Sequence, residues 1–169
     1  FHDSAAALVV DGTVVAAVEE ERITRRKHDA SFPTRAIDAC LATAGVVPLE
    51  VDLVAFHEKP LDVVDRHLKT RIRSGPLGAP ALLWETPEVV AAQLGVPRAV
   101  SRWFHDRRSP VPRIEYVEHH TSHAAAAFYA SPYEEAAVLT VDGVGELATS
   151  SIGIGRGRRR AAPVRAGPA

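Results

Sequence analysis

The sequence predicts a mixed α/β protein, and three observations indicate this class. Short apolar runs that are partly β-branched, at residues 5–10, 13–18, 51–56, 114–117 and 136–141, are typical of strands. Segments suited to helices stand between several of these runs, at residues 34–44, 87–94, 96–104 and from 119 onward. Asp-Gly dipeptides, which favour tight turns, follow two of the runs. Strands that alternate with helices are what an α/β sheet requires.

The N-terminal segment predicts a β-hairpin that is followed by a charged segment. Asp11 and Gly12 form the turn between the runs at 5–10 and 13–18. Residues 19–28 follow, and their cations, among them Arg25 and Lys27, can bind a phosphate or a carboxylate. A solvated loop is an equally consistent interpretation. His2 stands at the mouth of this hairpin and is a candidate base or substrate-positioning residue, or simply a residue at a chain end.

The middle of the chain carries weaker signals. The amphipathic segment 34–44 predicts a helix with Cys40 as a small buried residue. A loop is expected at residues 75–80, and a helix at 87–94 with Thr86 as its N-cap and Pro87 at its first position. A further helix at 96–104 and a strand at 114–117 lead to a histidine-rich block. The scattered histidines at 57, 67 and 105 are interpreted as surface or packing residues.

The histidine-rich block, residues 118–129, predicts a metal site at the start of a helix. His119 and His123 are four residues apart, so their side chains share one helix face and can bind one divalent ion. His120 points elsewhere and is a weaker candidate. Two histidines do not complete a site, so a carboxylate must come from another segment. A helix entry with solvated histidines is the alternative interpretation.

The segment 136–146 supplies a candidate for that carboxylate. The run 136–141 predicts a buried central strand, and Asp142 then lies at its carboxyl end, where open α/β sheets bind their ligands. Gly143 and Gly145 allow backbone N–H groups to approach an anion closely. Asp142 is therefore a candidate for the carboxylate that completes the metal site. A hairpin that turns at Asp142-Gly143 is about as consistent with these residues.

Six groups of residues, in one order, resemble the N-terminal part of a known family. They are residues 2–6, 19–28, 32–33, 119–123, 131–137 and 140–146, with the sequences HDSAA, EEERITRRKH, FP, HHTSH, SPYEEAA and TVDGVGE. The family is that of the carbamoyltransferases, which includes nodulation-factor and antibiotic O-carbamoyltransferases. Each group alone is weak evidence for the family, but together the groups cover most of residues 1–154.

The resemblance implies an actin-like ATPase (ribonuclease-H-like) superfold, incomplete here, of the type found in tRNA threonylcarbamoyl transfer proteins. It implies transfer of a carbamoyl group from carbamoyl adenylate, which a further domain of a full-length chain makes from carbamoyl phosphate and ATP. The acceptor is a hydroxyl of a small molecule. The family match assigns a divalent metal, expected to be Fe²⁺, to His119, His123 and Asp142. The expected cofactor-binding residues are Arg25, Lys27, Asp142, Gly143 and Gly145, with Asp142 at the nucleotide phosphates, and the expected catalytic residues are His2 and Asp142.

The same resemblance predicts a fragment. Residues 1–154 are expected to be part of the N-terminal domain, without the strand that precedes His2 in the family and without the adenylate-forming domain. Residues 155–169 contain only Arg, Ala, Gly, Pro and Val, which predicts a disordered tail read out of frame. This chain alone is expected to be inactive. The alternatives are an inactive remnant, a metal-dependent hydrolase and a tRNA threonylcarbamoyl-transfer-like metalloprotein.

Composition limits the partners. The 169 residues carry a formal net charge of −1, so the basic surplus of a nucleic-acid-binding protein is absent. One cysteine cannot form an intramolecular disulfide, and no apolar run reaches the roughly 20 residues that span a bilayer. No signal peptide is visible. We expect a cytoplasmic protein that binds neither nucleic acid nor membrane.

Overall fold

A computed structural model describes residues 3–75, 79–143 and 148–157, and it confirms the mixed α/β class. The chain divides into two compact units, residues 1–54 with 95–113 and residues 55–94 with 114–169. Each unit is described by itself. Among the described residues the strands form three two-stranded sheets, which pair β1 with β2, β3 with β4 and β5 with β6. The actin-like superfold stays a prediction.

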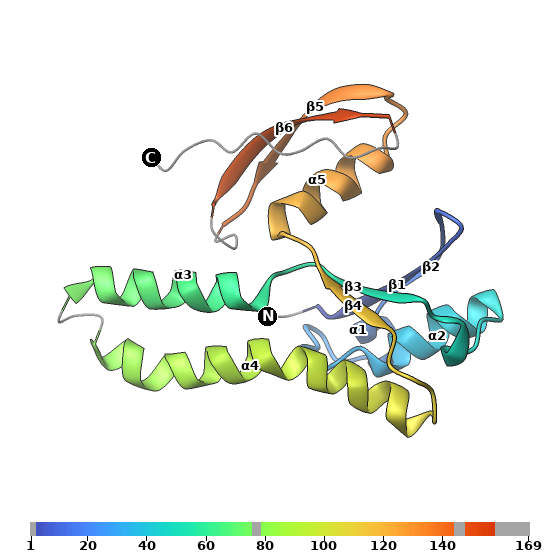
Figure 1. Ribbon diagram of the computed structural model, residues 1–169, viewed down its shortest axis with the longest axis horizontal. Helices are drawn as coiled ribbons and strands as arrows, with labels where there is room; N and C mark the ends of the chain where they lie inside the picture. The colour runs from blue at the N-terminus through green and yellow to red at the C-terminus, as the bar shows by residue number, and fades with distance from the viewer. Residues whose placement is uncertain (1–2, 76–78, 144–147, 158–169) are drawn as a thin grey trace. The chain divides into compact units, whose positions relative to one another are not determined.

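The helices and strands are shown in chain order in Figure 1. They are β1 (Ala5–Val10), β2 (Thr13–Glu19), α1 (Glu20–Thr24), α2 (Thr34–Ala44), the 3-10 turn η1 (Pro48–Glu50), β3 (Leu53–Phe56), α3 (Pro60–Arg73), α4 (Ala79–Asp106), β4 (Arg113–Tyr116), α5 (His119–Tyr129), β5 (Glu135–Val141) and β6 (Ser150–Arg156). The positions of β1, β2 and α2 confirm the sequence predictions for residues 5–18 and 34–44.

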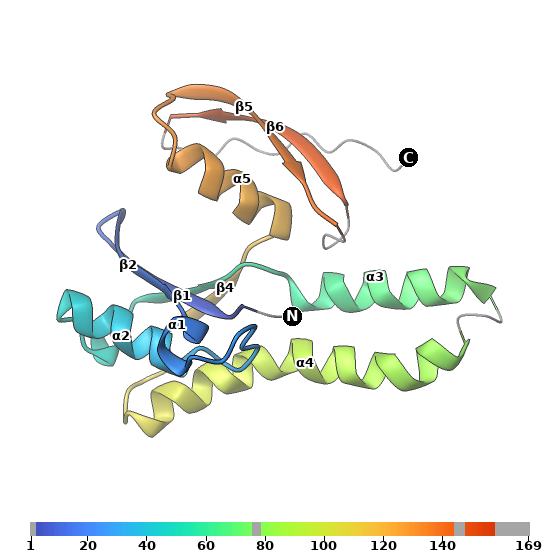
Figure 2. The ribbon, with the colours of Figure 1, turned by 180° about the vertical axis from the view of Figure 1, so that it is seen from behind.

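The first unit is built on the predicted N-terminal hairpin. Asp11 and Gly12 have φ values of 50° and 78°, as a tight hairpin turn with the native strand twist needs. β1 and β2 are antiparallel, with a bulge between Leu8 and Val9. Helix α2 packs against this hairpin (Figure 2). The Cys40 thiol lies 3.5 Å from the Ala6 carbonyl. The hairpin thus has one covered face.

The end of α4 is fixed to α2 by one arginine. The Arg107 guanidinium donates to both carboxylate oxygens of Asp38, at 2.8 and 2.6 Å. The same guanidinium lies 4.0 Å from the ring centroid of Trp103, which is buried. A bidentate ion pair combined with a cation–π contact is more specific in geometry than a simple surface pair. The buried apolar residues of this unit accordingly come from α2 and from the end of α4.

The charged run that follows β2 contains a buried helix cap which the sequence did not reveal. Glu20 is only 3% exposed, and its carboxylate accepts hydrogen bonds from the backbone N–H groups of Arg35 and Ala36, at 3.2 and 2.7 Å. These are free donors in the first turn of α2, whose own N-cap residue, Pro33, supplies no side-chain cap. Glu20 therefore caps α2 from a distance in sequence and places its negative charge at the positive end of that helix.

Glu20→Gln is expected to lower the free energy of unfolding by about 1–2 kcal/mol, because it removes a charge-assisted cap from a buried position. Urea denaturation followed by circular dichroism measures the change. Glu19→Gln is the matched control: Glu19 forms an exposed ion pair with Arg22 at 3.0 Å, so its loss should change stability by less than about 0.5 kcal/mol. Equal stabilities of the two variants would contradict the capping role.

Cys40 confirms the prediction of a small buried side chain, since it is 3% exposed. Burial raises the pKa of this thiol, partly offset by a hydrogen bond from the Val18 backbone. The thiolate population at neutral pH is therefore small, and we expect Cys40 to react with iodoacetamide at least about tenfold more slowly in the folded chain than in urea. Mass spectrometry of timed samples measures both rates. Similar rates would show that the thiol is open to solvent.

Helix α4 corrects the expectations for the middle of the chain. It is one continuous helix over residues 79–106, rather than two helices at 87–94 and 96–104. Thr86 is not an N-cap but lies within α4, where its hydroxyl contacts Nε2 of His67 on α3 at 3.2 Å. Pro87, expected at a first helical position, lies inside the helix, and Ala79 and Pro80, expected in a loop, are helical. Contacts with α3, including the ion pair of Arg71 with Glu85, support the helix despite its prolines.

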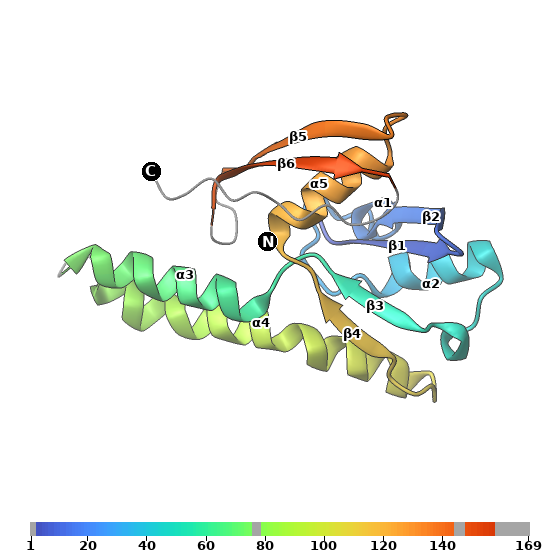
Figure 3. The ribbon, with the colours of Figure 1, turned by 45° about the horizontal axis from the view of Figure 1, so that its top comes forward.

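The second unit contains a hairpin with one helix packed on it. β5 and β6 are antiparallel, and α5 packs against both strands (Figure 3). The expectation of a buried central strand at 136–141 is wrong for the described residues: β5 pairs with β6, and Leu139 and Val141 are 68% and 77% exposed. The hairpin of the alternative interpretation is confirmed, but its turn at Asp142-Gly143 is wrong, because the Asp142 N–H pairs with the Thr149 carbonyl at 2.8 Å. β6 reaches Arg156, two residues past the boundary expected at 154.

The helices of this structure do not identify a membrane protein. Over the residues that the structure describes, none combines the length and the apolar character needed to cross a bilayer.

Candidate metal centre

Helix α5 brings two histidines together, as their spacing predicted. The helix begins at His119, and a short connection joins it to the end of β4. The Nε2 atoms of His119 and His123 lie 3.1 Å apart, and the two ring centroids lie 4.6 Å apart. Because at most one of two facing ring nitrogens can carry a hydrogen between them, the other turns a lone pair toward this point. The helix start thus positions two nitrogen ligands side by side.

The end of β5 adds the carboxylate. Oδ2 of Asp142 lies 2.7 Å from Nε2 of His119 and 3.8 Å from Nε2 of His123. The Asp142 backbone N–H donates to the Thr149 carbonyl at 2.8 Å, which extends the β5–β6 ladder by one residue and fixes the position of the carboxylate. The structure therefore brings together all three residues for which the sequence predicted a metal site.

The three side chains have the donors and the access that a transition-metal ion needs. Their nitrogen and oxygen atoms all lie within 4.8 Å of one another. His119 and Asp142 are 19% and 28% exposed, whereas His123 is 54% exposed, so the group is held on one side and open on the other. Two imidazoles and one carboxylate with open positions form a ligand set that suits Fe²⁺ and related divalent ions. The residues present fit such an ion.

His57 and Glu58 lie next to this centre, at the end of β3. The rings of His57 and His119 are 5.8 Å apart in an edge-to-face arrangement. Partial desolvation lowers the pKa of His57, the nearby Glu58 carboxylate opposes this effect, and the neighbouring His119 and His123 add to it. The sequence interpretation of His57 as a surface or packing residue missed this neighbourhood, because more than 60 positions separate it from His119 and only its place at a strand end could have indicated it.

The other residues that the sequence analysis considered for the site lie in different parts of the chain. Arg25 and Lys27 are exposed in the first unit, and Gly143 is exposed at the end of β5 with no atom within 4 Å of an added Cβ. His2 and Gly145 lie outside the described residues. His120 is buried, and within the described part of the chain neither of its ring nitrogens has a hydrogen-bond partner.

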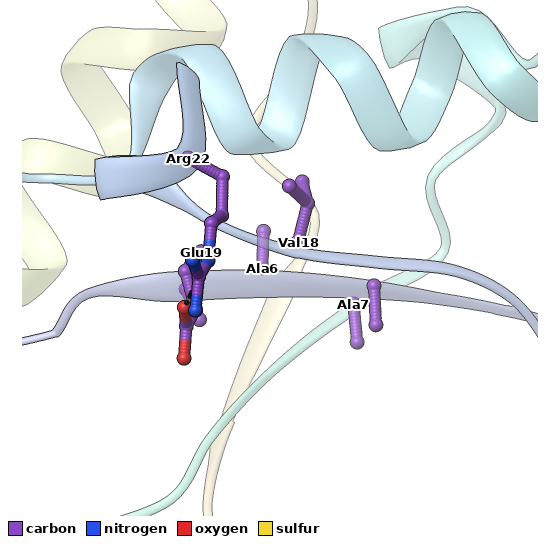
Figure 4. A pocket seen from close by; sticks show the side chains of 7 residues that line it. Ala6, Ala7, Val18, Glu19 and Arg22 are labelled. Atoms are coloured by element: carbon purple, nitrogen blue, oxygen red, sulfur yellow. Dashed lines mark hydrogen bonds and ion pairs between the residues drawn. The ribbon is translucent and has the colours of Figure 1, made fainter. Parts of the chain in front are cut away.

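The first unit has a depression and a polar cluster of its own. An open depression of about 500 Å³ lies over the small side chains of the β1–β2 hairpin, and Glu19 and Arg22 stand beside it (Figure 4). Separately, Nδ1 of His28 lies 2.9 Å from Oδ1 of Asp3, and the His28 backbone N–H donates to Glu21 at 2.9 Å. The lining residues of the depression include none of the predicted metal or nucleotide ligands.

Comparisons with known proteins agree on one family. The family model described as carbamoyltransferase N-terminus matches residues 1–165. An uncharacterized protein of Synechocystis sp., sll1178, is 46% identical over 164 residues, which are 94% of this chain and 26% of that protein. The nodulation protein NolNO of Sinorhizobium fredii is 38% identical over 161 residues, 93% of this chain and 22% of that protein. The chain thus spans about a quarter of the length of these relatives, and the match includes part of the segment 155–169.

Proposed function

Because the chain belongs to the carbamoyltransferase family, whose N-terminal part it matches over residues 1–165, we propose that it forms the metal-binding portion of an O-carbamoyltransferase. The observation that carries this proposal is the convergence of His119, His123 and Asp142 from α5 and β5. Membership of the carbamoyltransferase family supports an acceptor that is a small molecule rather than a nucleic acid. The net charge of −1 agrees with an acceptor that is not a nucleic acid, because nucleic-acid-binding proteins usually carry a basic surplus.

The proposed reaction needs more than this chain. Carbamoyl phosphate, ATP and water would give carbamoyl adenylate, phosphate and pyrophosphate in a further domain. The carbamoyl group would then pass to an acceptor hydroxyl, with AMP as the leaving group, at an actin-like domain that includes this chain. Since the chain spans about a quarter of its relatives, we expect it to bind metal but not to transfer carbamoyl groups unaided. A remnant that keeps the metal site without turnover is the alternative function.

Each residue has a chemical role in this proposal. His119, His123 and Asp142 would hold the divalent ion, with Fe²⁺ expected, and when bound it supplies Lewis-acid polarisation of carbonyl or phosphate oxygens. The backbone N–H groups of Gly143 and Gly145 would donate hydrogen bonds to phosphate oxygens. Arg25 and Lys27 would bind the anionic groups of the nucleotide or the carbamoyl donor. His2 would accept the proton of the attacking hydroxyl.

His119→Ala and His123→Ala are each expected to weaken Fe²⁺ or Zn²⁺ binding at least about tenfold, because each removes one of three protein ligands. Anaerobic titration with elemental analysis of the purified chain measures affinity and metal content. His105→Ala is the matched control, since His105 is exposed on α4 in the first unit. The far-ultraviolet circular dichroism of all variants should match that of the wild type.

Equal metal binding by the wild type and both α5 variants would refute the metal centre. An equal loss in His105→Ala would show that binding reflects scattered surface imidazoles rather than the convergence at α5.

A further inference from the structure

His119 belongs to two groups of metal-ligand atoms, not one. The first is the group with His123 and Asp142 described above. The second consists of His57, Glu58 and His119, whose ligand atoms also lie within 4.8 Å of one another. Each group contains two imidazoles and one carboxylate. The centre therefore has the same donor set twice, with one shared histidine.

Backbone contacts fix the position of the second group. The Val117 N–H donates to the Phe56 carbonyl at 2.8 Å, which ties the end of β3 to the residue two positions before His119. The Ser122 hydroxyl, on α5, donates to the His57 carbonyl at 3.4 Å. His57 and Glu58 are thus held beside the first turn of α5 from two directions. Their approach to His119 follows from the pairing of β3 with β4 and from the start of α5.

The side chains of the second group are oriented as well as placed. The Phe56 and His57 rings have centroids 4.8 Å apart, which restricts the imidazole. Nε2 of Gln93, on α4, donates a hydrogen bond to Oε2 of Glu58 at 3.4 Å. A ligand carboxylate that is itself hydrogen-bonded is typical of metal sites. His57 is exposed, so an ion bound there would keep open positions.

A shared histidine is chemically possible as an imidazolate. A neutral imidazole has one nitrogen with a free valence for a metal, and the second cation replaces the proton on the other nitrogen, which is released to water. One carboxylate in each group supplies a negative charge to each cation position, Asp142 in the first and Glu58 in the second. Two adjacent cations suit substrates with several phosphate or acyl oxygens, since the pair can bind both sides of a reacting group.

We propose that this centre binds two divalent cations, the first at His119, His123 and Asp142 and the second at His57, Glu58 and His119. The inference rests on the proposed function for the first position, and the second position is new. The open side of the second cation would accept oxygens of a phosphate-containing substrate, the chemical class to which a nucleotide or an acyl phosphate belongs.

Cobalt binding to the purified chain tests the proposal. Equilibrium dialysis against Co²⁺ with elemental analysis is expected to give about two ions per wild-type chain and about one in His57→Ala and in Glu58→Gln. His123→Ala should also retain about one ion, at the second position. His67→Ala is the control, because His67 contacts Thr86 away from the centre and its loss should leave the stoichiometry unchanged. Circular dichroism verifies that each variant is folded.

The outcomes separate the two proposals. One ion in the wild type that His123→Ala removes and His57→Ala leaves would overturn the second position and keep the first. Two ions retained in both His57→Ala and Glu58→Gln would also overturn it. A wild-type chain that binds no Co²⁺ would overturn the proposed metal centre together with this inference. The Co²⁺ visible spectrum gives a second measurement, because His57→Ala should remove one set of bands and leave that of the first position.

Discussion

Asp142→Ala is expected to lower the turnover of a longer carbamoyltransferase polypeptide that carries this chain by about 100-fold, whereas His105→Ala should leave it within about twofold. Among the described residues, Asp142 supplies the carboxylate of the first cation position, and its oxygen contacts His119 and His123. Its loss removes a ligand and leaves the two imidazoles without their negative partner. His105 is exposed on α4 and contributes to neither group of metal ligands.

Mass spectrometry of a hydroxylated acceptor incubated with carbamoyl phosphate, ATP and the protein measures this turnover. Asp142→Asn is a useful second variant, because it keeps the shape of the side chain and removes only the charge; it should also lose most of the activity. Metal analysis of each sample separates a loss of the ion from a loss of folding. Similar losses from Asp142→Ala and His105→Ala would show that the active site lies elsewhere.

The approach of His119 to His123 could be predicted because its information is local. The i, i+4 spacing of His119 and His123 fixes their shared face in any helix, and α5 begins at the first of them. Asp142 was predictable from its place at the end of an apolar run, even though the type of sheet was not. In contrast, His57 reaches the centre only through the pairing of β3 with β4, and a single sequence does not specify which strands pair.

The fold shows the same division between local and long-range information. Asp11 and Gly12 specify the β1–β2 hairpin because few other residues accept positive φ at both turn positions. Helix α4 could not be recognised because its prolines and Gly95 are signals that usually end a helix, and only contacts with α3 show that it continues. Glu20 was hidden for a related reason: its role as a cap depends on α2, fifteen residues away.

The exposed face of the β5–β6 hairpin explains the error in the predicted central strand. Leu139 and Ile152 are directly paired, and both are more than half exposed. An apolar strand normally indicates burial on both faces. Here α5 covers one face of the hairpin, and the described residues leave these two side chains on the other. Composition therefore predicted that residues 136–141 form a strand, but not how many neighbours that strand has.

Gly155→Ala is expected to lower the free energy of unfolding by about 3 kcal/mol, the upper end of the range for overpacking. An added Cβ would lie 2.6 Å from Cγ and Cε2 of Phe128, a buried residue by which α5 packs on β6. The ring cannot retreat without moving α5, and α5 carries His119 and His123. Metal affinity should therefore fall together with stability, although Gly155 is not a ligand.

Gly95→Ala provides the opposite result in the same chain. Gly95 lies inside α4, where an added Cβ meets no atom within 4 Å, so the better helix former should raise the free energy of unfolding by about 0.5–1 kcal/mol. Denaturant unfolding of both variants, with Co²⁺ titration of each, makes the comparison. Opposite signs in stability, with metal binding weakened only in Gly155→Ala, would show that close packing of α5 on β6 positions the metal ligands. Unchanged stability and affinity in Gly155→Ala would mean that Phe128 is free to move, and that the ligands are positioned by β4 and the end of β5 instead.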